Sequence, residues 1–129
     1  MKWLDRSLVQ SPLCYGVCFT EADFHKELAK MKVSPADWPE FISPSANATV
    51  HHFLTTDEVD ECCIVCIKKT KLPVHQVTAL LSHEAVHVWQ AIRRNIGEHE
   101  PSDEFEAYAV QSIVHNLVQA YYDKGKKKK

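Results

Sequence analysis

The chain has 129 residues, of which 45% are hydrophobic and 25% charged, and its formal net charge is −2. This length is usual for one domain, and the apolar fraction is sufficient for a hydrophobic core. No apolar run approaches the ~20 residues needed to cross a bilayer, so we expect no membrane association. The first residues, Met1 to Arg6, lack the apolar stretch of a signal peptide.

We predict a single domain over residues 1–123 and a flexible lysine-rich tail over residues 124–129. Five lysines lie in this tail. They could bind nucleic acid or another acidic surface by releasing counterions, but a short basic run at a chain end is more often a solvated segment. Nucleic acid is therefore not an expected partner, and the pattern does not indicate an oligomeric state.

The first quarter of the chain predicts a strand followed by a helix. Residues 1–12 indicate an irregular arm or a short helix. Residues 13–19 are rich in strand-forming side chains and predict the first strand. Thr20 is a suitable N-cap for a helix that continues to about Lys32, with its apolar residues on one face.

The middle of the chain predicts a hairpin. Residues 33–47 contain prolines that interrupt regular structure and form a connection. Residues 48–54 predict a second strand, and the nearly all-apolar residues 62–67 predict a third, buried on both faces or central in a small sheet. The acidic segment 55–60 predicts the turn between these two strands.

The five cysteines are an odd number, and no secretory signal accompanies them. Both facts argue against a disulfide framework. A structural zinc site made of cysteines is conceivable, but the chain has no Cys-x2-Cys pair that is repeated twice, as such sites have. We expect reduced thiols that are buried in strands as small hydrophobic side chains.

Two long helices are predicted for the last third of the chain. Pro73 precedes the first helix, residues 74–95, and Gly97 ends it. The second helix covers residues 102–122. Ser102 is its expected N-cap, and acidic residues fill the first turn, as the helix dipole favours.

The first long helix contains the motif His83-Glu84-Ala85-Val86-His87. Residues four apart lie on one helix face, so His83 and His87 can both reach one zinc ion. Glu84 is rotated by about 100° and can reach a metal-activated water without binding the metal. This pattern indicates a zinc-dependent peptidase with Glu84 as general base. The alternative is an amphipathic helix with two ordinary, partly buried histidines.

A catalytic zinc site of this kind needs a third protein ligand. The metzincin pattern would place a glycine and a histidine where this chain has Gln90 and Arg93, so that class is excluded. The remaining source is a glutamate from the following helix, either Glu104 or Glu106. The predicted apolar stripe of that helix comprises Ala107, Val110, Val114, Leu117, Val118 and Tyr121. Both glutamates flank this stripe at similar angles, so the pattern does not choose between them.

The segment Glu104–Ala107 resembles the Glu-x-x-Ala segment of gluzincin peptidases, in which the first glutamate binds zinc. With the His-Glu-x-x-His helix included, residues 78–118 resemble small metallopeptidase-like proteins of tailed bacteriophages. The resemblance implies Glu104 as the third ligand and the cytoplasm of a bacterial host. It also implies a minimal zincin-like α+β domain, with a small, mainly antiparallel sheet packed on the two long helices. Tyr108 departs from the pattern, since several gluzincin families have Asp or Asn there to hold a zinc-binding histidine.

The sequence thus predicts Zn²⁺ bound by His83, His87 and Glu104, and hydrolysis of a peptide or protein substrate. Tyr108 and His115 share a flank of the last helix with Glu104, and either could donate a hydrogen bond to an oxyanion. Ordinary structural roles are the alternative for both residues. The alternative function is a non-catalytic, zinc-containing phage protein that acts as a binding module on a host protein.

One further prediction concerns the adjacent histidines of the second strand. Because side chains alternate along a strand, His51 and His52 point to opposite faces of the sheet. One of them could enter the cleft as a transition-state donor, with an ordinary strand position as the alternative.

Overall fold

The computed structural model describes residues 1–4, 13–54 and 60–123. In chain order the elements are β1 (Lys2–Trp3), β2 (Cys14–Cys18), α1 (Glu21–Lys30), the 3-10 helix η1 (Pro35–Asp37), β3 (Ala48–Phe53), β4 (Cys62–Ile67), α2 (Val74–Asn95) and α3 (Asp103–Asp123). The predicted α+β class is confirmed. Among the described helices, none is both long enough and apolar enough to cross a membrane.

The strands and long helices begin and end within two residues of their predicted bounds. The N-terminal arm differs, because Lys2–Trp3 pairs with β2 as a short strand instead of being irregular or helical. The tail 124–129, most of the arm and most of the acidic turn lie outside the described residues.

The sheet has the strand order β1-β2-β4-β3. Strands β3 and β4 form the predicted antiparallel hairpin, and β1 is antiparallel to β2. Strands β2 and β4 are parallel, so the sheet is mixed and only in part antiparallel. A parallel pair needs a long connection between its strands, and here α1 and β3 lie within that connection.

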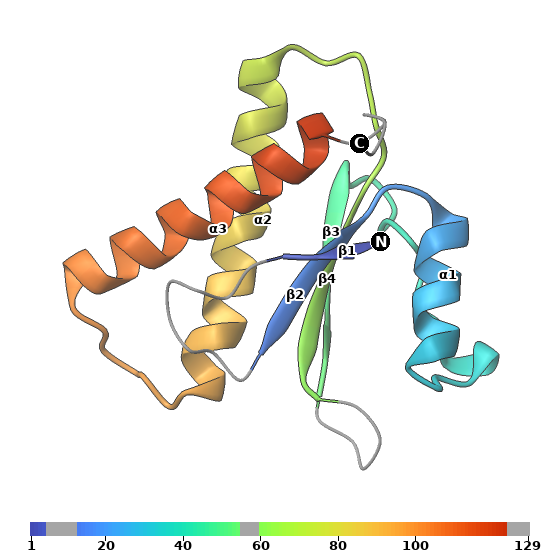
Figure 1. Ribbon diagram of the computed structural model, residues 1–129, viewed down its shortest axis with the longest axis horizontal. Helices are drawn as coiled ribbons and strands as arrows, with labels where there is room; N and C mark the ends of the chain where they lie inside the picture. The colour runs from blue at the N-terminus through green and yellow to red at the C-terminus, as the bar shows by residue number, and fades with distance from the viewer. Residues whose placement is uncertain (5–12, 55–59, 124–129) are drawn as a thin grey trace.

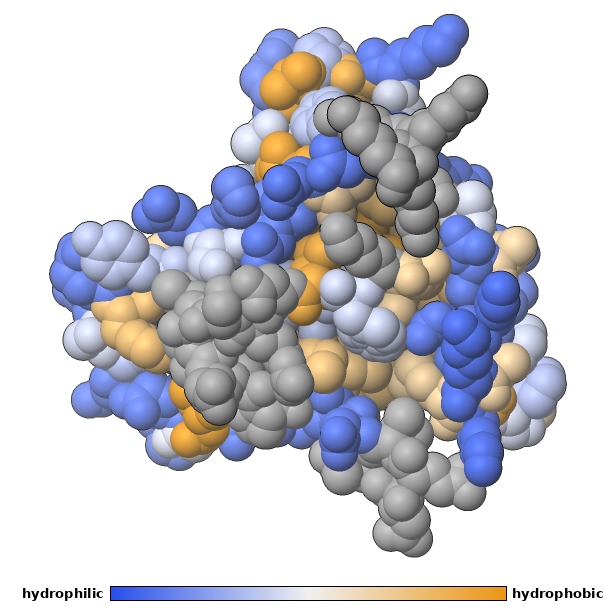
Figure 2. Space-filling model, viewed as in Figure 1, coloured by the Kyte–Doolittle hydropathy of each residue, from blue (hydrophilic) through white to orange (hydrophobic). Residues whose placement is uncertain are grey.

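Helix α1 covers one face of the sheet, and α2 and α3 cover the other (Figure 1). Strand β4 lies between these layers, and all its residues are buried, as predicted. Cys63, Val65 and Ile67 pack with α2 and α3, whereas the alternate residues of β4 pack with α1. In the space-filling view, hydrophobic side chains show over the sheet between the helices and in smaller patches over the two long helices (Figure 2).

Local signals begin and end the helices as expected. The Oγ1 of Thr20 accepts a hydrogen bond from the backbone N–H of Asp23 (3.1 Å). The Oγ of Ser102 accepts one from the N–H of Phe105 (3.3 Å). Gly97 follows α2 with φ +71°, a left-handed conformation in which a glycine meets no steric penalty. These caps satisfy backbone groups that a helix end leaves without partners.

The predicted apolar stripe of α3 was partly wrong. The buried residues are Ala109, Ile113, Leu117 and Tyr121, while Ala107 is exposed. The true buried face is rotated by about 70° from the predicted one, at about 100° per residue. Apolar residues cover a wide arc of this helix, so their pattern alone did not locate the centre of the buried face.

Candidate metal centre

His83 and His87 lie side by side on α2. Their Nε2 atoms are 3.2 Å apart, and their rings meet edge to face. Two nitrogens that each bind one tetrahedral zinc ion at ~2.0–2.1 Å are themselves separated by roughly 3.3 Å. The pair therefore has the spacing of two ligands of one metal ion, as the motif predicts.

Gln90 orients one of these two rings. Its Oε1 accepts a hydrogen bond from Nδ1 of His87 (3.1 Å). A proton on Nδ1 leaves Nε2 of the neutral ring unprotonated, which is the form that binds metals. The tautomer of His87 thus suits metal binding through the nitrogen that faces His83.

Glu84 lines the same pocket as the histidine pair and is only 4% exposed. Burial raises the pKa of its carboxyl group, and the nearby His83 and His87 oppose this effect. A carboxylate with a raised pKa holds a proton more readily than an exposed glutamate does, as a general base must during proton transfer. Glu84 thus shares a pocket with the two histidines, and its role as general base stays a prediction.

His83, Glu84 and His87 line a pocket of about 350 Å³ between α2 and β3. Besides His83, Glu84 and His87, its lining residues are Ser43, Ala46, Ala48, Thr49, Val50, His52, Gln90, Ala91 and Arg94. Strand β3 is the last strand of the described sheet on this side. The pocket thus places the histidine pair beside a sheet edge.

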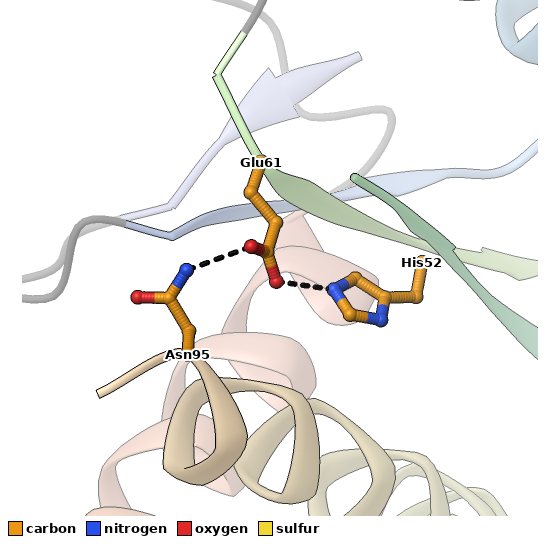
Figure 3. A network of polar contacts seen from close by, with 3 residues as sticks. All are labelled: His52, Glu61 and Asn95. Atoms are coloured by element: carbon orange, nitrogen blue, oxygen red, sulfur yellow. Dashed lines mark hydrogen bonds and ion pairs between the residues drawn. The ribbon is translucent and has the colours of Figure 1, made fainter. Parts of the chain in front are cut away.

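A polar network joins His52, which lines this pocket, to Glu61 and Asn95 (Figure 3). Nε2 of His52 donates a hydrogen bond to Oε2 of Glu61 (2.5 Å). The other carboxylate oxygen of Glu61 accepts one from Nδ2 of Asn95 (2.7 Å). The network connects β3, the residue before β4 and the last residue of α2. Glu61 and Asn95 were not predicted from the sequence, because residues 34 positions apart show no local pattern.

The predicted glutamates of α3 lie elsewhere. Oε2 of Glu106 accepts a hydrogen bond from Nε1 of Trp89 (2.8 Å). At about 100° per residue, Trp89 points roughly 120° away from His83 and roughly 160° away from His87. Glu104 is exposed, and on the same scale it points away from the buried face of α3. Helix α3 therefore begins on the side of α2 that is remote from the histidine pair.

Of the three predicted zinc ligands, the structure brings together two, His83 and His87. Over residues 1–4, 13–54 and 60–123, no three His, Cys, Asp or Glu side chains form a group that could hold a metal ion. His83 and His87 are brought together, and Glu104 is not brought to them. Tyr108 and His115, the proposed oxyanion donors, are exposed on α3 and do not line the pocket.

The cysteines have the predicted state. All five are free thiols, and four of them are buried in strands, while Cys14 is partly exposed.

Comparisons with known proteins found no relative of this chain. The chain matches no protein-family model, and no curated protein and no solved structure matches it significantly.

Proposed function

We propose that this chain is a zinc-dependent peptidase of zincin-like architecture, with His83 and His87 as metal ligands and Glu84 as general base. The observation that carries the proposal is the 3.2 Å separation of the two Nε2 atoms in a pocket that a buried glutamate also lines. An ordinary amphipathic helix has no need for a buried carboxylate at this position, because desolvating a carboxylate is costly.

The proposed chemistry assigns a separate task to each residue. When bound, zinc would supply Lewis-acid activation of a water molecule and of the substrate carbonyl. Glu84 takes a proton from that water as its oxygen forms a bond to the amide carbon. The same carboxyl group then releases the proton to the nitrogen as the carbon–nitrogen bond breaks. Gln90 holds the ring of His87 in the tautomer that this arrangement needs.

The edge position of β3 supports a peptide as the substrate. An extended peptide can add to a free sheet edge through backbone hydrogen bonds. Ala48, Thr49 and Val50 of this strand line the pocket that also contains Glu84. A peptide along β3 would pass the histidine pair. On the resemblance to phage proteins, we place this activity in the cytoplasm of a bacterial host.

The test combines metal analysis with a peptide-library digestion followed by mass spectrometry. We expect about one zinc ion per chain, loss of zinc in His83→Ala and His87→Ala, and loss of cleavage but retention of zinc in Glu84→Gln. His115→Ala, an exposed histidine outside the pocket, is the matched control and should behave as the wild type. Cleavage that persists in Glu84→Gln would overturn the proposal.

The second candidate is a non-catalytic binding module that acts on a host protein. It is favoured by one observation, that the described residues do not assemble three metal ligands. A structural zinc site normally has four protein ligands and no open position, so a purely structural metal also finds no complete site here. This candidate predicts that wild-type protein cleaves no member of the peptide library at any zinc concentration.

A further inference from the structure

We propose that His52, on β3, is the third protein ligand of the metal centre, and that Glu61 holds its ring in place. This inference rests on the proposed metal site but changes its composition, because the sequence pattern placed the third ligand on α3. Of the pocket-lining residues outside the His-Glu-x-x-His motif, His52 is the one whose side chain commonly binds zinc.

The register of the hairpin sets the direction of the His52 side chain. His52 pairs with Cys63 of β4, and paired residues of neighbouring strands point to the same face. Cys63 packs with α2 and α3, so His52 points toward α2. His51 pairs with Ile64 and points the other way, where its ring stacks on Phe24 of α1.

Glu61 gives His52 the surroundings of a metal ligand. Zinc-binding histidines usually donate one ring N–H to a carboxylate and bind the metal through the other nitrogen. Nε2 of His52 makes such a bond with Glu61, and Asn95 anchors the carboxylate from α2. Nδ1 makes no hydrogen bond with the described residues. Figure 3 shows this second nitrogen on the side of the ring turned away from Glu61.

The two candidate ligands differ in the change that each needs to reach the histidine pair. His52 already lines the pocket with His83 and His87, and its side chain is 29% exposed. Among the described residues the three rings do not form a metal-binding group as they lie, so metal binding requires the His52 ring to move within the pocket together with the Glu61 carboxylate that holds it. Glu104 lies on α3, which Trp89 and Glu106 hold against another face of α2. Its carboxylate would reach the pair only if α3 moved around α2.

The experiment measures zinc affinity by competition with a chromophoric chelator and records the visible spectrum of the Co²⁺-loaded protein. We expect His52→Ala to weaken zinc binding about 100-fold or more and to change the Co²⁺ spectrum. Glu61→Gln should weaken zinc binding about 10-fold, as loss of a carboxylate that supports a ligand does. Glu104→Ala and the exposed control His115→Ala should bind zinc as the wild type does. Circular dichroism confirms that each variant is folded, and Glu61→Gln serves as the second probe if His52→Ala is not.

The outcomes separate this inference from the proposed function. Zinc binding lost in His83→Ala and Glu104→Ala but unchanged in both His52→Ala and Glu61→Gln would overturn the inference and leave the peptidase proposal standing. Wild-type protein that binds no zinc, or binds it equally well in His83→Ala, would overturn the peptidase proposal itself.

Discussion

Trp89 and Glu106 determine on which side of α2 the last helix packs. The indole Nε1 of Trp89 donates a hydrogen bond to Oε2 of Glu106 (2.8 Å), and the ring of Phe105 meets the same indole edge to face. Trp89 is almost fully buried. These contacts place the first turn of α3 away from His83 and His87, so they also decide which acidic residues can take part in a metal site.

Trp89→Phe should therefore destabilise the fold without affecting the metal. The substitution keeps an aromatic ring but leaves the carboxylate of Glu106 without its donor. We expect the free energy of unfolding in urea to fall by about 1–3 kcal/mol, as for a lost hydrogen bond to a charged group. Glu106→Gln retains an acceptor oxygen for the indole N–H, so its free energy of unfolding should fall less than that of Trp89→Phe. Zinc binding that disappears in Glu106→Gln would contradict this account and make Glu106 a ligand.

Glu84→Gln should raise the stability of the metal-free protein. Burial opposes ionisation of this carboxyl group, and a neutral amide of nearly the same size removes that cost. We expect an increase of about 1 kcal/mol in the free energy of urea unfolding, the size of gain seen when a functional site is relieved of an unfavourable group. Glu98→Gln, at an exposed position after α2, is the control and should change little. A clear loss of stability in Glu84→Gln would show that the carboxylate has a structural role instead.

His51 should make the fold less stable as the pH falls below about 6.5. Burial lowers the pKa of His51, against the smaller effect of backbone hydrogen bonds to Phe41 and Glu40. The unfolded chain, with an ordinary histidine pKa of about 6.5, then takes up a proton that the folded protein does not, so the free energy of unfolding decreases. The stabilisation that comes from keeping His51 neutral is fully present above about pH 6.5 and is lost as the pH falls toward the lowered pKa of His51.

Urea unfolding at pH 7.5 and 5.5 tests this prediction. His51→Gln cannot titrate but can still donate a hydrogen bond to the carbonyl oxygen of Phe41, which Nε2 of His51 contacts at 3.1 Å. The variant should lose less stability between the two pH values than the wild type does. The exposed His99 provides the matched control, His99→Gln. An equal pH dependence in wild type and His51→Gln would rule out His51 as the source.

The cysteines should differ sharply in their reactivity. Burial raises the pKa of Cys62 and of Cys63 to about 12 and also raises that of Cys66. Since the thiolate is the reactive form, iodoacetamide at pH 8 should leave these thiols unmodified in the native protein. Cys14, which is partly exposed, should react first. Mass spectrometry with a urea-denatured control measures the pattern, and rapid native labelling of Cys66 would contradict the buried position of β4.

The amino-acid sequence by itself determined the local features of this protein. A spacing of four residues places His83 and His87 on one face of any helix, and Pro73 and Gly97 indicate where that helix begins and ends. The unbroken apolar run of residues 62–67 likewise predicted a strand that is buried on both faces or central in the sheet, and the buried strand β4 confirms it. These features depend on neighbours within a few residues, so their periodicity is visible in the sequence.

Only the tertiary structure decided which distant residues join the histidine pair. Apolar side chains cover a wide arc of α3, and its packing in the shared core fixes its rotation. In this rotation Glu106 bonds to Trp89, and Glu104 is exposed. The pairing of β3 with β4 brings His52 to the pocket, and Glu61 meets Asn95 across 34 residues. Contacts of this kind arise when separate elements exclude water from a common core, and no local period in the chain encodes them.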